Sequence, residues 1–270
     1  MRFTEVTGAG GVRLAVREAG DPARPTIAFV HGWAQSGEVW AHQLRDLAAD
    51  FHLLAVDLRG HGRSAVPADG YGDTRVWADD LAAVLALAGG PATVVGWSYG
   101  GLVITDYLRH HGCAALSGIV LVGALTEIGR GRPGGATGPV MRAALPDVLS
   151  EDADVAVPAV LALTRGMTAG PAPDVQARVA ATLAVPPAVR RALFTRDVGS
   201  GDVLADTRVP VVVAHGTEDA VVAPAAAEYA LGKIPGASAR WFPGVGHLPF
   251  AERADAFTRT VAALAGGRKE

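Results

Sequence analysis

The chain has very little cysteine and lysine. Among 270 residues only Cys113 is a cysteine, which excludes an intrachain disulfide and a metal site built from several cysteines. We interpret Cys113 as inert packing and expect a reducing compartment. Only Lys233 and Lys269 are lysines, and the formal net charge is −3, so no basic stripe offers a surface to nucleic acid or an anionic membrane. The expected partners are therefore small molecules.

Signals for secretion and membrane insertion are also missing. Glycines interrupt residues 1–11 before an apolar run of the kind found in signal peptides develops. Residues 81–105 carry no charge, but Gly89, Gly90 and Pro91 divide this run into a helix-like and a strand-like half. We expect a cytoplasmic protein.

Short β-branched runs alternate with longer amphipathic runs along the chain. Several short runs are apolar on both faces, as strands inside a parallel sheet must be. Strands are expected at residues 12–18, 26–30, 52–56, 92–97, 118–122, 209–214 and 237–242, and helices at residues 38–49, 75–88, 99–111, 223–231 and 252–264. The alternation predicts an α/β fold with a mostly parallel sheet, helices on both faces and ligands at the carboxyl ends of the strands.

One segment breaks this rhythm. Residues 125–201 are rich in alanine, proline and glycine, contain helix-like pieces and show no clear strand. We expect them to form a helical cap inserted over a core made of residues 1–124 and 202–270.

Residues 96–100 read GWSYG and match the pattern G-x-S-x-G. In this pattern a serine sits on a strained turn between a strand and a helix, and the flanking glycines relieve the clash that the turn would cause. The position of the motif after the expected strand 92–97 favours Ser98 as a nucleophile. The alternative is an ordinary turn in which Ser98 caps the helix.

A serine nucleophile needs a base and a carboxylate that orients the base. Asp219 follows the expected strand 209–214, and His247 is the only histidine after it. The order serine, aspartate, histidine is the one used with this type of turn. Glu218 is the rival carboxylate, and we favour Asp219.

The developing oxyanion needs two backbone N–H donors. Tyr99, directly after Ser98, is the first expected donor, and Trp33, in the loop after the expected strand 26–30, is the second. His31 and His61 are interpreted as hydrogen-bonded structural histidines rather than catalysts.

Together these segments resemble the α/β-hydrolase superfamily over nearly the whole chain. The matching motifs, in order, are HGW at 31–33, DLRGHGRS at 57–64, GWSYGG at 96–101, HGTED at 215–219 and GVGHLPF at 244–250. HGWAQSGEVW together with GWSYGG looks most like the carboxylesterases that include the pimeloyl-carrier-protein methyl esterase. The resemblance implies a triad of Ser98, His247 and Asp219, no cofactor, and a substrate pocket roofed by the cap.

A competing motif is formally present in residues 60–65, GHGRSA, which satisfy the dinucleotide-binding pattern G-x-G-x-x-G/A. Pro67 and the turn-rich residues after it prevent a helix from opening there, so we interpret the segment as a structural loop. No P-loop and no H-E-x-x-H zinc motif occurs.

These observations predict a serine hydrolase, with neither cofactor nor metal, that cleaves a carboxylic ester, thioester or lactone. Met141, Met167 and Phe194 are the larger apolar residues of the expected cap, which favours a small, mainly apolar acyl substrate. The alternatives are C–C bond cleavage, perhydrolysis or natural-product cyclisation on the same fold, or a ligand receptor that keeps the triad. Arg190 and Arg191 suggest docking of an acidic acyl-carrier protein, against the alternative of a solvated helical surface.

Overall fold

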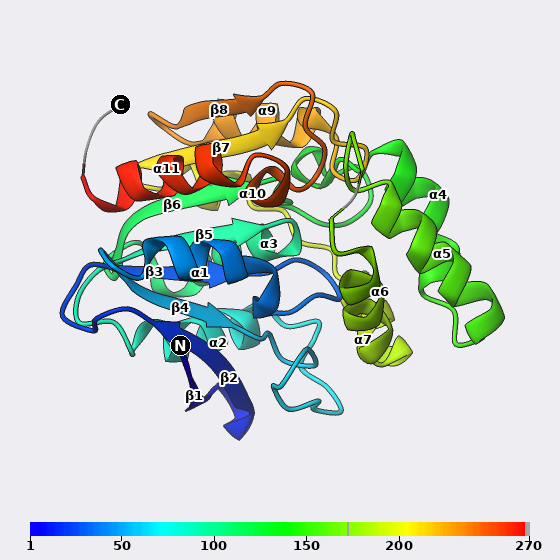
Figure 1. Ribbon diagram of the computed structural model, residues 1–270, viewed down its shortest axis with the longest axis horizontal. Helices are drawn as coiled ribbons and strands as arrows, with labels where there is room; N and C mark the ends of the chain where they lie inside the picture. Colours follow the sequence, from blue (N-terminus) through cyan, green and yellow to red (C-terminus); the bar gives the residue numbers. More distant parts are fainter. Residues whose placement is uncertain (172, 268–270) are drawn as a thin grey trace.

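A computed structural model describes residues 1–171 and 173–267 (Figure 1). An eight-stranded sheet crosses the molecule in the order β1-β2-β4-β3-β5-β6-β7-β8. Its strands are β1 (Arg2–Thr7), β2 (Arg13–Ala19), β3 (Thr26–Val30), β4 (His52–Val56), β5 (Ala92–Trp97), β6 (Leu116–Val122), β7 (Val211–Gly216) and β8 (Ser238–Phe242). The pairings from β4 to β8 are parallel, whereas β1 with β2 and β2 with β4 are antiparallel. The predicted mostly parallel sheet is confirmed.

The central strands owe their position to sequences that are apolar on both faces. Every residue of β3, β4 and β5 is buried, as parallel strands covered by helices on both sides must be. By contrast, β1 is a half-exposed edge strand with the sequence RFTEVT. The sequence pattern does not predict β1, because no face of this segment is continuously apolar.

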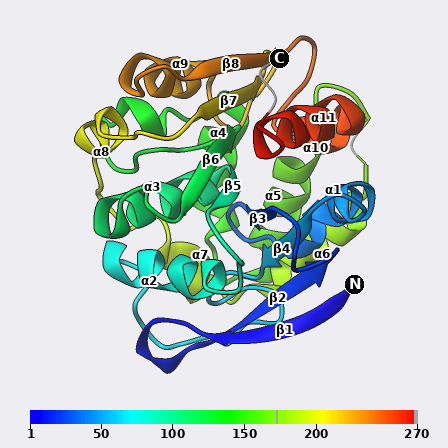
Figure 2. The same cartoon turned by 90° about the vertical axis from the view of Figure 1, so that its left-hand side faces the viewer.

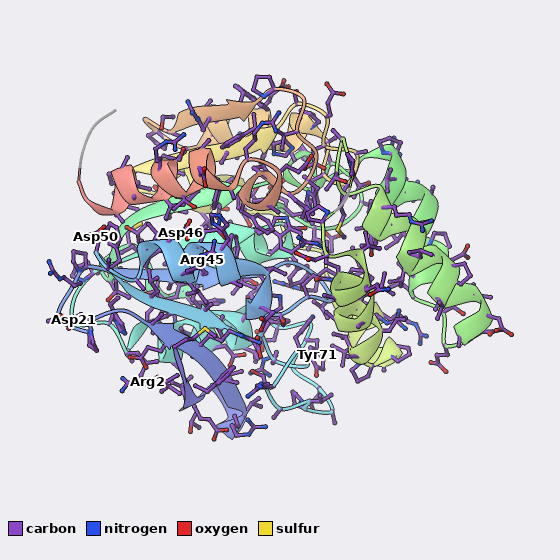
Figure 3. All side chains as sticks on the ribbon, viewed as in Figure 1. Arg2, Asp21, Arg45, Asp46, Asp50 and Tyr71 are labelled. Atoms are coloured by element: carbon purple, nitrogen blue, oxygen red, sulfur yellow. The ribbon has the colours of Figure 1, made fainter. Side chains whose placement is uncertain are left out.

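Helices cover both faces of the sheet. Figure 2 shows α1 (Ala41–Leu47) and α11 (Ala254–Ala265) on one face, and α2 (Thr74–Leu85), α3 (Tyr99–His111) and α9 (Pro224–Lys233) on the other. Figure 3 shows charged side chains such as Asp21 and Arg45 on the outside, whereas Trp40, Trp77 and Trp97 are fully buried.

Two expected helices are divided. The helix expected at 38–49 is a 3-10 turn, η2 (Gly37–Trp40), followed by α1. The one expected at 252–264 is α11, preceded by the short α10 (Pro249–Glu252), because Arg253 between them has non-helical backbone angles.

The long connection between β6 and β7 is helical, as expected. It contains α4 (Pro139–Val148), α5 (Ala153–Arg165), α6 (Val175–Ala184) and α7 (Pro187–Ala192), followed by α8 (Gly201–Ala205) at its junction with the core. Helices α4 to α7 lie beyond the carboxyl ends of the parallel strands (Figure 1). Isolated bridges join Ile128 to Val198 and Thr137 to Val222. Within the described residues, no helix combines the length and the apolar character needed to cross a membrane.

Candidate active site

Ser98 occupies a strained turn between β5 and α3. Its backbone angles, φ 54° and ψ −118°, are unusual for a residue with a side chain and cost on the order of 1–3 kcal/mol. The turn is held by the segment after β6. Ser98 N–H donates to Val122 O over 3.1 Å, and Leu125 N–H donates to Ser98 O over 3.0 Å. Neighbouring backbone therefore fixes the conformation that presents Ser98.

Glycines beside the turn allow close approach of other backbone. A Cβ on Gly96 would lie 2.5 Å from Ile104 Cδ1, and a Cβ on Gly100 would lie 2.5 Å from Val30 O. This agrees with the expected role of the glycines, which leave room for the serine turn. The Ser98 side chain makes no helix-capping hydrogen bond, so the alternative of a simple cap residue is wrong.

The structure brings His247 and Asp219 together at the carboxyl-terminal edge of the sheet. His247 Nδ1 lies 2.8 Å from Asp219 Oδ2, and both residues are buried. Asp219 Oδ1 accepts two hydrogen bonds of 2.9 Å, from the N–H groups of Val221 and Val222. An ionised carboxylate can only accept, so Nδ1 carries the proton and Nε2 is left free to act as a base. Glu218, the rival carboxylate, is exposed, and in the described part of the chain the carboxylate that bonds to His247 is that of Asp219.

The main chain of His247 is also fixed. Its N–H donates to Met167 O over 2.6 Å, and its carbonyl accepts a 3.0 Å bond from Trp97 Nε1. The rings of Trp97 and His247 are 5.3 Å apart between centroids. The residue directly before Ser98 therefore holds the histidine.

Two residues beside this pair were missed by the sequence analysis. Gly123 has φ +48°, and a Cβ there would lie 3.0 Å from His247 Nδ1 and 3.3 Å from Asp219 Oδ2. His215 Nε2 donates to Val222 O over 3.1 Å and lies 3.4 Å from Asp219 Oδ2, while burial lowers the pKa of its ring. The position of Gly123 at the end of a strand and the HGTED motif were the available signals.

The loop after β3 lies directly beside Ser98. A Cβ on Gly32 would come within 2.9 Å of Ser98 Cβ. Next in this loop is Trp33, and Tyr99 begins α3. In the described part of the chain, neither Trp33 N–H nor Tyr99 N–H donates to a backbone carbonyl. Both N–H groups therefore belong to segments that adjoin Ser98.

His31 and His61 behave as structural residues, as expected. Leu58 N–H donates to His31 Nε2 over 3.0 Å, and Ala34 N–H donates to His61 Nε2 over 3.2 Å. Each ring then carries its proton on Nδ1 and donates it to a backbone carbonyl, on Gly32 and Arg59 respectively. Burial lowers the pKa of His31 to about 3 and that of His61 to about 4, so both rings are neutral.

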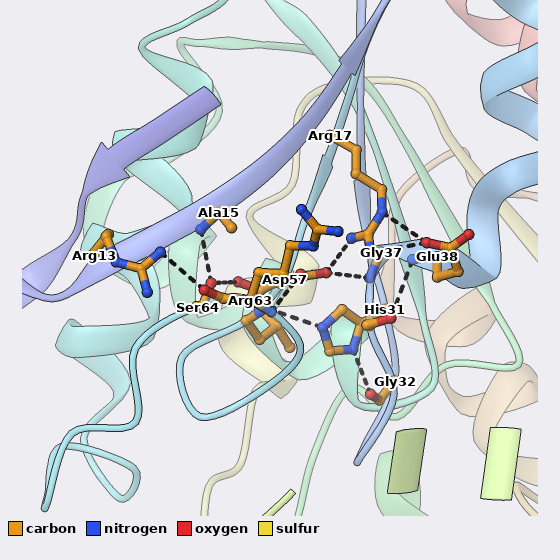
Figure 4. A network of polar contacts seen from close by, with 12 residues as sticks. Arg13, Ala15, Arg17, His31, Gly32, Gly37, Glu38, Asp57, Arg63 and Ser64 are labelled. Atoms are coloured by element: carbon orange, nitrogen blue, oxygen red, sulfur yellow. Dashed lines mark hydrogen bonds and ion pairs between the residues drawn. The ribbon is translucent and has the colours of Figure 1, made fainter. Parts of the chain in front are cut away.

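Asp57 organises the loop that carries the formal dinucleotide motif (Figure 4). Its carboxylate pairs with Arg17 and accepts bonds from Gly37 N–H over 2.7 Å and Arg63 N–H over 2.8 Å. The Ser64 hydroxyl bonds to the Asp57 carbonyl. Residues 60–65 form turns rather than the start of a helix, which supports the interpretation as a structural loop.

Of the two arginines considered for carrier docking, only one is exposed. Arg190 is buried, and its Nη1 donates to Val148 O over 2.7 Å, so its charge is not available on the surface. Arg191 is exposed and pairs with Glu151.

Two of the three larger apolar residues of the expected cap are buried, and Phe194 is half-buried. Met141 and Met167 are buried, and the Phe194 ring lies 5.5 Å from that of Trp33. A groove of about 420 Å³ lies between α6 and the α1 and α10 region, but neither Ser98 nor these three apolar residues line it.

One group of three potential metal ligands occurs among the described residues. It comprises His42, Asp46 and Asp255, on α1 and α11. It shares no residue with the Ser98 region, so it does not contribute to this site.

Comparison with known proteins gives consistent results. Residues 27–260 match the alpha/beta hydrolase family. A pimeloyl-[acyl-carrier protein] methyl ester esterase from Vibrio atlanticus (strain LGP32) is 30% identical over 259 residues, covering 89% of this chain and 94% of that protein. The crystal structure of the esterase RhEst1 from Rhodococcus sp. ECU1013 is 43% identical, with a TM-score of 0.96 and 100% of both chains covered. A bifunctional esterase/perhydrolase from Acinetobacter calcoaceticus is 37% identical over 125 residues, 46% of this chain and 45% of that protein.

Proposed function

The chain belongs to the alpha/beta hydrolase family, and on this premise we propose that Ser98, His247 and Asp219 form the catalytic triad of a serine esterase. The family and the esterase relatives make the protein a hydrolase that cleaves esters. The observation that carries the triad is the 2.8 Å contact of His247 Nδ1 with Asp219 Oδ2, taken together with the strained turn that holds Ser98 at φ 54°. These are the base, the orienting carboxylate and the serine on a strained turn that this chemistry needs.

In the proposed reaction, His247 Nε2 takes the proton of Ser98 Oγ as this oxygen attacks the ester carbonyl carbon. The N–H groups of Trp33 and Tyr99 stabilise the oxyanion of the tetrahedral intermediate. The bond to the alkoxy oxygen then breaks, and the alcohol leaves with the proton held by His247. Water attacks the acyl-enzyme with the help of the same histidine and releases the acid, while Asp219 stabilises the imidazolium in both steps.

For the substrate, we propose a small, mainly apolar acyl ester, thioester or lactone beneath a cap formed by residues 125–201. The buried Met141 and Met167 and the contact of Phe194 with Trp33 support an apolar surrounding. The Vibrio relative acts, by its name, on an ester attached to an acyl-carrier protein, so a carrier-bound ester is a further candidate. Because Arg190 is buried, such a carrier would have to dock elsewhere than on the Arg190–Arg191 pair.

The proposal is tested with a panel of p-nitrophenyl esters of graded chain length and a fluorophosphonate label located by mass spectrometry. We expect a burst followed by steady hydrolysis, label on Ser98, and loss of both in Ser98→Ala. Hydrolysis that survives in Ser98→Ala would contradict the assignment. Ligand stabilisation without turnover would instead indicate a receptor.

The partial match to an esterase/perhydrolase favours perhydrolysis as a second candidate reaction. In that reaction hydrogen peroxide replaces water as the nucleophile that attacks the acyl-enzyme, which produces a peracid. Measuring peracid and free acid from the same ester at increasing peroxide concentration separates the two reactions.

A further inference from the structure

A buried arginine joins the segment between β6 and β7 to the helix that follows Ser98. Arg196 lies just after α7 and is 4% exposed. Its Nη1 donates to Tyr99 Oη over 2.9 Å, and its Nη2 pairs with the carboxylate of Asp106. The proposed mechanism uses neither Arg196 nor Asp106.

Both partners of Arg196 lie on one face of α3. Tyr99 is the first residue of this helix, and Asp106 follows seven positions later, about two turns along, on the same side. Tyr99 and Asp106 are each 0% exposed. The planar guanidinium of Arg196 bonds to Tyr99 and Asp106 at once, and it therefore fixes the orientation of the first two turns of α3.

The same segment also holds the other residue proposed to stabilise the oxyanion. Trp33 Nε1 donates to Arg190 O over 3.0 Å, and Tyr99 Oη lies 3.4 Å from Leu193 O. Burial raises the pKa of Tyr99 to about 12, so its hydroxyl keeps the proton that it donates to Leu193. Residues 190–196 thus form hydrogen bonds with the side chains of Trp33 and Tyr99, the two residues proposed to supply the oxyanion-hole N–H groups.

We propose that Arg196 is a positioning residue for the oxyanion hole, which acts through the hydroxyl of Tyr99. The inference rests on the proposed function, because it requires that Tyr99 N–H stabilises an oxyanion. Such a donor is effective only when it lies about 2.7–3.1 Å from the place where the charge develops, and small displacements are costly in rate. Asp106 neutralises the guanidinium, so Arg196 contributes geometry rather than a net positive charge.

The hydroxyl of Tyr99 allows the role to be tested with the smallest possible change. Tyr99→Phe removes one hydroxyl oxygen and leaves the backbone N–H of residue 99 in place. Arg196→Met removes both guanidinium bonds and leaves the buried Asp106 carboxylate without its ion-pair partner. Arg191→Met is the matched control, because Arg191 lies in the same segment but is exposed and pairs with Glu151. Thermal unfolding of every variant shows which of them are folded.

We expect Tyr99→Phe and Arg196→Met each to lower kcat about 10-fold or more, with KM within about 2-fold, since the lost interaction acts in the transition state. Affinity for a boronic acid, which forms a tetrahedral adduct with the serine, falls by a similar factor. The double variant falls little further than the single ones, and Arg191→Met matches the unmodified protein.

Wild-type kcat and boronate affinity in Tyr99→Phe would overturn the inference, as would fully multiplicative losses in the double variant. If Arg196→Met does not fold, Tyr99→Phe alone decides. Failure of the proposed function gives a different result, because Ser98→Ala would then keep its activity whatever the Tyr99 variant does.

Discussion

Asp219 holds His247 with one carboxylate oxygen and its own loop with the other. Oδ2 lies 2.8 Å from His247 Nδ1, and Oδ1 accepts the N–H groups of Val221 and Val222. The carboxylate is therefore locked in the orientation that selects the histidine tautomer with a basic Nε2.

We predict that Asp219→Asn lowers kcat about 1,000- to 10,000-fold while leaving the fold intact. The amide can still take part in hydrogen bonds, but it cannot stabilise the imidazolium and it favours the wrong tautomer. Steady-state hydrolysis of a p-nitrophenyl ester measures the effect. Glu218→Gln is the control, and a loss of similar size in that variant would mean that the carboxylate has been assigned wrongly.

In the motif HGTED the sequence favoured Asp219 but did not exclude Glu218. Glu218 and Asp219 are adjacent, and only the turn after β7 decides which one points inward. Asp219 N–H donates to Gly216 O within the turn, whereas Glu218 N–H donates to the distant Val245 O, so a tertiary contact helps to set this turn. Local propensity carries no information about such contacts. The contact of Arg196 with Tyr99 could not be predicted from the sequence for the same reason, because 97 positions separate the two residues.

The elements of the core were easier to predict than those of the edge. Strands that are buried on both faces, such as β3 and β5, show as continuous apolar runs. The edge strand β1 has no such run, and pairing with β2 rather than its own pattern makes it a strand. The burial of Arg190 could not be predicted from the sequence either, because its partner is the backbone carbonyl of Val148 and every residue has such a carbonyl.

Gly100→Ala should destabilise the protein by about 1–3 kcal/mol, and more if the strand cannot move. The added Cβ would lie 2.5 Å from Val30 O and 3.0 Å from His31 O, which are backbone atoms of β3 and the loop after it. Chemical denaturation measures the change. Gly72→Ala, at an exposed position with no atom within 4 Å of the new Cβ, is the matched control and should change stability by less than about 0.5 kcal/mol. Equal losses of stability in the two variants would show that the close approach of residue 100 to the backbone of Val30 does not determine the cost of the substitution.

Asp57→Ala should cost about 3–5 kcal/mol, because it removes the buried partner of the Arg17 guanidinium and leaves only the exposed Glu38 to pair with it. It also removes the acceptor for Gly37 N–H and Arg63 N–H. Glu38→Gln changes the other partner of Arg17, which is exposed, and should cost no more than about 1 kcal/mol. Urea denaturation of both variants provides the comparison. A smaller loss for Asp57→Ala than for Glu38→Gln would contradict the central role of Asp57.

His31 and His61 should make the protein less stable in mild acid. Their pKa values in the folded state, about 3 and about 4, lie below the ordinary value of about 6.5 that applies in the unfolded chain. At pH values between the folded-state and unfolded-state pKa values, the histidines are protonated in the unfolded chain but neutral in the folded protein. The free energy of unfolding therefore falls as pH falls from about 6.5 toward 4.

Each histidine contributes a slope of up to about 1.4 kcal/mol per pH unit in that window. Their ring centroids are 5.2 Å apart, so in the folded state a proton on one ring further disfavours a proton on the other, which keeps both rings neutral across this window. His61→Gln replaces the ring with a neutral amide that can still accept the Ala34 N–H. Its stability should therefore fall less steeply than that of the unmodified protein between pH 6.5 and pH 4.5. Urea denaturation at several pH values gives the two slopes, and parallel lines would show that His61 takes up its proton equally well in the folded and unfolded states.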